Sequence, residues 1–252
     1  MRRPEPASGY RISAAAGLGL VLVVVLMSAA IRLNAASVSP MFGEAGLRGL
    51  RALHRSAASL EVLAALGLAW TAWRRGVSSW MPITAVLALT LFLAGLGMAA
   101  GRTPTAVQAM GNVLGGLALA AAFAWLAGEK GSGPFSPQLR VAGKRVLTPF
   151  LLGLLVLQAL IGARLSILGR SDAPALPLHA LLGLGASGLL AWFALARIEG
   201  SASRAFFVLA LAAPIAGFTA LQYEYSPAAA LVHAASAALL VAGCAFVLGR
   251  NA

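Results

Sequence analysis

The feature that most constrains this chain is a series of long apolar runs. A transmembrane helix needs about 20 apolar residues, because the hydrocarbon core of a bilayer is roughly 30 Å thick. Seven runs of about that length carry no charged residue, and an eighth carries a single acid, Glu61. The runs cover residues 12–31, 56–73, 83–100, 105–126, 146–163, 173–195, 205–223 and 226–249. The sequence therefore predicts an all-α polytopic membrane protein with eight transmembrane helices.

The composition agrees with this class and excludes others. Apolar residues make up 60% of the 252-residue chain and charged residues only 10%, which leaves too little polar surface for a soluble domain. The net charge of +12 is interpreted as a membrane signature, so membrane lipids are expected partners and nucleic acid is not. The single cysteine, Cys244, excludes an internal disulfide.

The basic residues are unevenly divided between the two sides of the predicted bundle. Positive charge favours the cytoplasmic side, which predicts an integral protein of the bacterial inner (plasma) membrane with both termini in the cytoplasm. The opposite face is nevertheless rich in arginine, either to hold an anion or to reach lipid headgroups. The residues assigned to the cytoplasmic side are Arg2, Arg3, Arg11, Arg74, Arg75, Lys130, Arg140, Lys144, Arg145, Arg197, Arg204 and Arg250.

The chain repeats itself in two four-helix bundles. Residues 1–127 form the amino-terminal half, 128–145 a polar cytoplasmic linker rich in glycine, proline and basic residues, and 146–252 the carboxy-terminal half. Arg32 and Arg164 follow the first apolar run of each half, and His54 and His179 each follow a leucine at the expected start of the second helix. The halves are therefore expected to be parallel repeats.

Histidine spacing indicates a site in each half. The step in numbering from His179 to His233 is the same as the step from His54 to Gln108 (233 − 179 = 108 − 54). All four are expected to begin helices near the outer membrane boundary. Paired imidazoles on facing helices are typical of a buried haem iron, although a lone histidine at a helix end is more often an interfacial polar residue. We therefore predict His179 and His233 as ligands of one haem and His54 as a ligand without its partner.

Gln108 has two interpretations at this stage. It is either an amide that bonds its neighbours at the start of a helix, or the residue facing a five-coordinate haem on His54, whose open position would suit oxygen chemistry.

The motifs that carry these residues resemble the haem A synthase family of cytochrome oxidase assembly enzymes. They are Leu53-His54-Arg55, the string at 157–163 that contains Gln158 and Gly162, and the segment 227–234 that leads to His233. The resemblance implies a membrane oxidoreductase that converts the haem O methyl group to the haem A formyl group for cytochrome oxidase biogenesis. It also implies a b-type haem cofactor on His179 and His233, with the substrate haem near His54.

The chain departs from that family at two positions. Gln108 stands where the family has a second substrate-side histidine, and Arg51 stands where a glutamate precedes the helix 2 histidine by three residues. Arg51 cannot accept a proton but can pair with a haem propionate. Arg32 and Arg164 are candidates for the same task or for interfacial anchoring. Glu61, seven residues beyond His54, is the nearest acid on that helix and is either a proton-handling residue or a structural carboxyl.

Three functions remain open from the sequence. The first is the haem A synthase-like oxidoreductase, with haem O or another haem as partner. The second is a non-catalytic haem b-binding homologue that acts as an assembly factor or a subunit of a respiratory membrane complex. The third is a transporter or other helical membrane protein without haem. Cytochrome oxidase, haem O synthase and a second copy of the chain are the protein partners considered.

Overall fold

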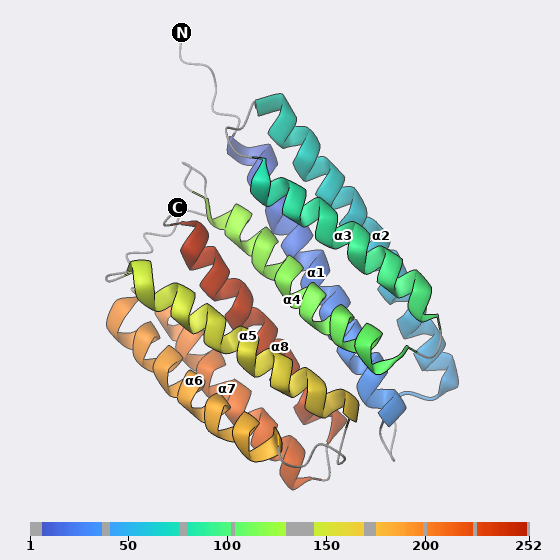
Figure 1. Ribbon diagram of the computed structural model, residues 1–252, viewed down its shortest axis with the longest axis vertical. Coiled ribbons are helices and arrows are strands. Elements are labelled where there is room, and N and C mark those ends of the chain that lie inside the picture. The colour runs from blue at the N-terminus through green and yellow to red at the C-terminus, as the bar shows by residue number, and fades with distance from the viewer. Residues whose placement is uncertain are drawn as a thin grey trace.

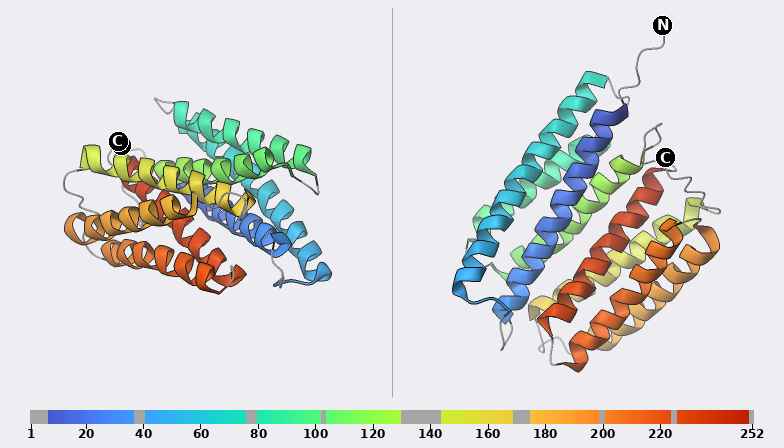
Figure 2. Two further views of the ribbon diagram at one scale, coloured as in Figure 1. Left: turned by 60° about the horizontal axis from the view of Figure 1, so that its bottom comes forward. Right: turned by 180° about the vertical axis from the view of Figure 1, so that it is seen from behind.

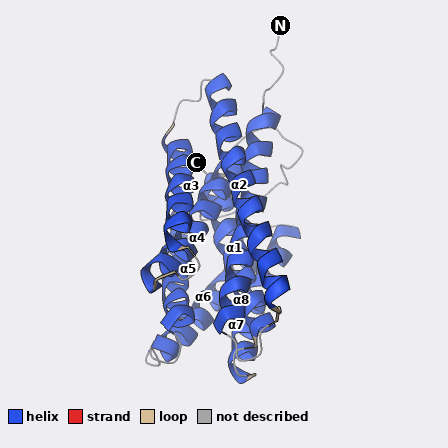
Figure 3. Ribbon diagram, turned by 90° about the vertical axis from the view of Figure 1, so that its right-hand side faces the viewer, coloured by secondary structure: helices blue, strands red, loops and turns tan. Residues whose placement is uncertain are grey.

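The computed structural model describes residues 7–36, 41–75, 80–101, 104–129, 144–168, 175–198, 201–223 and 226–250. Over these residues the chain forms eight α-helices and no β-sheet (Figures 1 and 3). The predicted linker lies mostly outside the described residues, as do Arg2, Arg3, Lys130, Arg140, Arg102 and Arg170. The helices are α1 (Ala7–Ala36), α2 (Glu44–Arg75), α3 (Met81–Ala100), α4 (Ala106–Gly128), α5 (Lys144–Leu168), α6 (Ala175–Arg197), α7 (Ser201–Gln222) and α8 (Pro227–Gly249).

Each of the eight helices is long and apolar enough to cross a membrane, so the predicted all-α membrane fold is confirmed. The start of α2 was predicted wrongly. This helix begins at Glu44 rather than near residue 56, and His54 is an internal residue of α2 instead of its first. Glu44 stabilises the first turn because its negative charge lies at the positive end of the helix dipole. Its Oε2 also lies 3.7 Å from Arg48 Nη1 in an exposed ion pair. The helix therefore continues well beyond its apolar run.

The connection before α2 is closed by one side chain. The Asn34 amide donates from Nδ2 to the Phe42 carbonyl oxygen at 3.2 Å, and its Oδ1 accepts from the Phe42 backbone N–H at 2.7 Å. Asn34 is buried, so satisfying both of its polar groups matters for stability. The pair ties the end of α1 to the residues that lead into α2.

The helices form two groups that meet along α4 and α8. In the first group α1 packs against α2 and α4, and α3 packs against α2 and α4; α5 to α8 repeat this pattern. Figures 1 and 2 show the blue-to-green helices on one side of the molecule and the yellow-to-red helices on the other. Contacts between the groups are α4 with α8, α1 with α8 and α4 with α5. Exchanging α1 with α5 and α4 with α8 leaves this set unchanged, which indicates an approximate twofold axis between α4 and α8.

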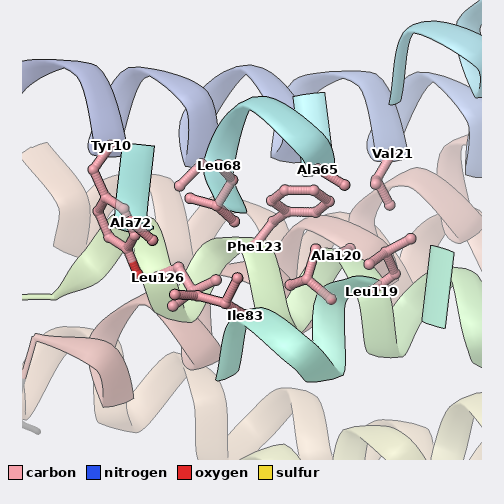
Figure 4. Close-up of a cluster of buried hydrophobic side chains, with 12 residues drawn as sticks. Tyr10, Val21, Ala65, Leu68, Ala72, Ile83, Leu119, Ala120, Phe123 and Leu126 are labelled. Atoms are coloured by element: carbon pink, nitrogen blue, oxygen red, sulfur yellow. The ribbon is translucent and has the colours of Figure 1, made fainter. Parts of the chain in front are cut away.

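The start of α1 and the end of α8 lie at the same end of the bundle (Figures 1 and 2), which we call the terminal end. The opposite end, where α6 and α8 begin, we call the histidine end. The core of the first group lies closer to the terminal end. Phe123 of α4 is fully buried between α1, α2 and α3, beside Val21, Leu68 and Ile83 (Figure 4).

The two groups touch backbone to backbone near the terminal end. A Cβ atom added to Gly128 of α4 would collide with the Phe246 carbonyl of α8, and one added to Gly249 of α8 would collide with the Trp125 carbonyl of α4. Glycine is required at both positions, because any side chain would push the helices apart. This reciprocal glycine contact fixes the register of α4 against α8.

The same end joins α1 to α4 through polar groups. The Tyr10 hydroxyl donates to Glu129 Oε2 at 3.3 Å, and the Arg11 guanidinium donates to the Glu129 backbone carbonyl. Burial raises the pKa of Glu129 above its ordinary value, while the Tyr10 hydrogen bond and the charge of Arg11 act in the opposite direction. Glu129 therefore holds its proton more tightly in the folded protein than in the unfolded chain.

Candidate functional site

Two histidine rings meet inside the second group of helices. His179 is the fifth residue of α6 and His233 the seventh of α8. Their ring centroids are 5.9 Å apart, with the planes at 75° to each other. Because α6 and α8 each pack against both α5 and α7, they are diagonal partners in this bundle, and the two rings approach each other across its interior.

His233 is held by the backbone of α7. Its Nδ1 lies 2.7 Å from the Ala213 carbonyl oxygen, and an N–H at Nδ1 would donate to that oxygen. The lone pair then resides on Nε2, the nitrogen that such an outer hydrogen bond prepares for a metal. One turn further along α7, a Cβ added to Gly217 would lie 3.0 Å from His233 Nδ1, so glycine leaves the space that the ring occupies.

His179 is held by α5. Gln158 Nε2 donates to the His179 backbone carbonyl oxygen at 2.8 Å and lies 3.5 Å from its ring Nε2. A Cβ added to Gly162 would lie 2.8 Å from His179 Cε1, and one added to Gly183 would lie 2.6 Å from Gln158 Nε2. Two glycines thus make room for the histidine and for the amide that supports it.

Two buried polar atoms beside the pair have no hydrogen-bond partner. They are His179 Nδ1 and Gln158 Oε1. Leaving such atoms unpaired costs roughly 1–3 kcal/mol each, so each calls for an explanation such as a bound water, ion or ligand. The orphaned atoms and the imidazole pair lie together, which points to one binding site.

The separation of the rings fits a haem iron. Two imidazoles bound on opposite sides of one metal, each through a bond of about 2 Å, would hold their ring centres roughly 6 Å apart, close to the observed 5.9 Å. Within the described residues, no group of three or more His, Cys, Asp or Glu side chains gathers to hold a metal ion. An iron at this site would therefore need its other ligands from elsewhere, as it has in a porphyrin. The residues present fit a bis-histidine haem.

The first group of helices presents a different picture around His54. This side chain is only partly buried, and Arg32 of α1 and its neighbour Arg55 are close enough to interact with it electrostatically. Arg32 Nη1 donates to Ser28 Oγ at 2.9 Å. In the part of the chain that is described, His54 makes no hydrogen bond and no ring contact, so its imidazole has no counterpart like His233.

Gln108 closes the start of α4. Its Oε1 accepts from the Thr105 backbone N–H at 2.8 Å and lies 3.2 Å from Thr105 Oγ1, while its own N–H lies 3.3 Å from that hydroxyl oxygen. This is a capping box, which satisfies N–H groups at a helix start. These are the hydrogen bonds of the first interpretation of Gln108, an amide that bonds its neighbours at the start of a helix.

The other predicted site residues do not gather at one point. Glu61 of α2 is buried, and it has no hydrogen-bonding or ionic partner among the described residues. Arg51 lies on the histidine-end extension of α2, three residues before His54, and is partly exposed. Arg164 lies near the histidine end of α5 and is exposed.

Gln158 and Gly162 belong to the motif at 157–163. The structure adds their contacts with His179, together with the Ala213 carbonyl and Gly217 beside His233. The four-residue spacing of Gln158 and Gly162 is a signal that these two residues share one helix face. No family model and no curated protein matches the chain.

Proposed function

We propose that this protein is a haem-binding integral membrane protein that holds one b-type haem between α6 and α8, with His179 and His233 as its axial ligands. The observation that carries the proposal is the 5.9 Å separation of the two partly buried rings on diagonal helices. The carbonyl partner of His233 and the glycines beside both rings support it, because outer hydrogen bonds and free volume are what a ligating imidazole needs.

The activity we propose is that of a haem A synthase-like oxidoreductase. Converting a methyl group and one water to a formyl group releases four protons and four electrons, so the reaction needs an external one-electron acceptor and a route for the protons. A haem on His179 and His233 would supply one-electron transfer. His54, with Arg32 and Arg55 near it, would bind a second haem, the substrate, whose propionates suit guanidinium partners such as Arg51.

Glu61 is the chain's candidate for receiving protons. It lies two turns from His54 on α2, and it is buried without a partner among the described residues. An ionisable side chain at that depth is costly and is retained for function by default. Replacing Glu61 with Gln should lower the yield of haem A while leaving haem binding unchanged, and full haem A formation would exclude Glu61 from the reaction.

The alternative is a non-catalytic haem b-binding homologue, an assembly factor or a subunit of a respiratory membrane complex. Two observations favour it. Gln108 is engaged in a capping box, and Arg51 stands where the resembled family has a glutamate. In either case we place the protein in the bacterial inner membrane with both termini in the cytoplasm, because basic residues dominate the terminal end. Cytochrome oxidase, haem O synthase and a second copy of the chain are the proposed protein partners.

The test is the visible spectrum and the extracted haem types of the purified protein, expressed with and without a supply of haem O. One low-spin haem b per chain supports the carboxy-terminal site, and haem A in the extract supports the oxidoreductase. Haem b without haem A, from cells that supply haem O, favours the non-catalytic homologue. A folded protein free of haem would exclude both.

A further inference from the structure

We infer that Glu61 of α2 and Thr90 of α3 form a proton-binding site inside the amino-terminal bundle, and that water reaches this site from the histidine end only. The site itself needs no haem. The inference rests on the proposed function in one respect, since it takes the oxidation of a haem methyl group as the source of the protons that the site receives.

Glu61 continues the face of α2 that forms the core of the first group. Ala65, Leu68 and Ala72 of this face are buried in the core beside Phe123 (Figure 4). Glu61 is four residues before Ala65, so it lies on the same face, one turn nearer the histidine end. Only 6% of Glu61 is exposed. Its side chain therefore lies in the interior of the bundle and not against lipid.

Thr90 continues the corresponding face of α3. Ile83 and Val86 belong to the same core, and Thr90, four residues after Val86, is 3% exposed. Its buried hydroxyl group has no hydrogen-bond partner among the described residues. Threonine hydroxyls on helices commonly bond to a carbonyl oxygen of the preceding turn, as those of Thr84 and Thr219 do at 2.9 and 2.8 Å. The Thr90 hydroxyl is thus left for a different partner.

The helices bring Glu61 and Thr90 to similar depths. Three close contacts between antiparallel neighbours set the levels: Gly67 with Ser13 of α1, Val25 with Gly116 of α4, and Gly115 with Leu93 of α3. Counted along these pairs, Glu61 is level with Val86, one turn or about 6 Å from Thr90. Side chains on helices point toward the start of their own helix. Because α2 begins at the histidine end and α3 at the terminal end, the two side chains converge along the bundle axis.

Glu61 has no opposite charge on the helices around it. Neither α3 nor α4 contains a charged or titratable residue within its bounds. Those of α1 and α2 lie toward the ends of these helices: Tyr10, Arg11 and Arg32 on α1, and Glu44, Arg48, Arg51, His54, Arg55, Arg74 and Arg75 on α2. A carboxylate at this depth would be uncompensated, whereas a carboxyl group that carries its proton can donate it to the Thr90 hydroxyl oxygen. The pair is therefore suited to take up and release a proton.

Packing differs on the two sides of the site. Toward the terminal end, the core faces are closed by fully buried side chains such as Leu68 and Phe123. Toward the histidine end, the same faces of α2, α3 and α4 become partly exposed, at His54, Leu93 and Asn112. Two of these three side chains are polar. Water can thus approach the site from the histidine end, while the apolar core blocks the other side.

Infrared spectroscopy of the purified protein at mildly acidic pH tests the proton and its partner. A protonated carboxyl group gives a C=O stretching band that carboxylates lack, and Glu61→Gln should remove one such band. Thr90→Val keeps the shape of the side chain and should shift this band, because the hydrogen bond is lost. Thr148→Val is the matched control, since the Thr148 hydroxyl is also buried without a partner, and should leave the band in place. Absence of a Glu61 band, or a band that Thr90→Val leaves unchanged, would overturn the inference.

Thiol labelling tests the side from which water enters. Cys244→Ala first removes the only cysteine of the chain. Glu61→Cys and Thr90→Cys should then react with a charged methanethiosulfonate added to the histidine-end side of vesicles that hold the protein in one orientation. Neither should react when the reagent is added to the terminal-end side. Thr148→Cys, at a fully buried position of α5, is the control and should react from neither side. Labelling of Glu61→Cys from the terminal end, or from neither side, would contradict the inference.

Both tests work on protein that contains no haem, so they separate this inference from the proposed function. A protein that shows the carboxyl band and the one-sided labelling but binds no haem would defeat the proposed function alone. A protein that holds the bis-histidine haem but lacks the band, or is labelled from the terminal end, would defeat this inference alone.

Discussion

The two halves differ most at the level of their histidines. Around His179 and His233 the adjoining helices α5 and α7 carry glycine, at Gly162 and Gly217, and the rings occupy the space. In the amino-terminal half the glycines stand on α4 instead, and leucines of α3 fill the space beside them, with Leu93 against Gly115 and Leu96 against Gly111. The two bundles thus differ in which helix carries the small residues at the level of the histidines, and in whether a histidine ring or a leucine side chain lies against them.

The largest expected effect comes from removing either imidazole of the carboxy-terminal pair. His179→Ala or His233→Ala should abolish the low-spin bis-histidine spectrum, because no other histidine lies in that half of the chain. His54→Ala is the control and should leave that spectrum intact. Visible spectra and haem-to-protein ratios measure the difference. Equal losses of haem in all three variants would contradict the expectation that the bis-histidine haem lies in the carboxy-terminal half alone.

A substitution can give the carboxy-terminal half the packing of the other. Gly217→Leu places a leucine where the added Cβ already lies 3.0 Å from His233 Nδ1. Overpacking of this kind costs about 1–3 kcal/mol, so haem affinity should fall roughly 5- to 150-fold. Gly185→Leu is the control, since a Cβ there meets nothing within 4 Å. Haem titration of both purified variants measures the two affinities. An unchanged affinity in Gly217→Leu would show that haem binding does not depend on glycine at this position.

Removing the amide beside His179 should have a smaller effect. Gln158→Leu deletes the donor to the His179 carbonyl oxygen and the group 3.5 Å from its ring. Loss of an outer-shell partner lowers metal affinity by roughly 10- to 100-fold, and the long contact with the ring places the expected loss near tenfold. Ser166→Ala is a control on the same helix, because that hydroxyl donates to the Ala163 carbonyl oxygen of α5 itself. Haem titration shows whether the Gln158 amide supports His179 as an iron ligand. Equal haem affinities in Gln158→Leu and the unmodified protein would show that Gln158 contributes packing alone.

The smallest effect concerns Glu129, which ties α4 of the amino-terminal half to α1. Its pKa is raised in the folded protein, chiefly by burial, so its contribution to stability is present at low pH. That contribution is lost as the pH rises from the ordinary glutamate range through the raised value. Glu129→Gln should therefore flatten the decline of the melting temperature above about pH 4.5. The exposed Glu44→Gln is the control, and identical pH profiles for Glu129→Gln and the unmodified protein would contradict the expectation.

The sequence predicts the eight helices well, because an apolar run of bilayer length has few other ways to fold. It misplaces the start of α2 because counting uncharged residues stops at Arg55, whereas the helix continues through Arg51 and Arg48 to Glu44. Charged residues do not end a helix that leaves the apolar layer, since their side chains can reach water while the backbone bonds continue.

The candidate site is predictable only in part. Regular spacing suggests that His179 and His233 belong together, and the structure brings their rings to 5.9 Å. The same spacing points to Gln108 on α4, but sequence distance does not reveal that α4 is one turn longer than α8 between this position and the glycine contact. The supports of the pair, such as the Ala213 carbonyl, depend on helix register and leave no pattern in the sequence.

The reciprocal glycine contact also dictates when the protein can be completed. Trp125 is made long before Phe246, so at a synthesis rate of about 5–20 residues per second α4 waits roughly 6–24 s for its partner. During that interval the glycine face of α4 is exposed to lipid, and the amino-terminal bundle must persist by its own packing around Phe123. The packing of the two halves against each other is consequently a late step in folding. A chain interrupted in the linker should still produce two fragments that associate within the membrane.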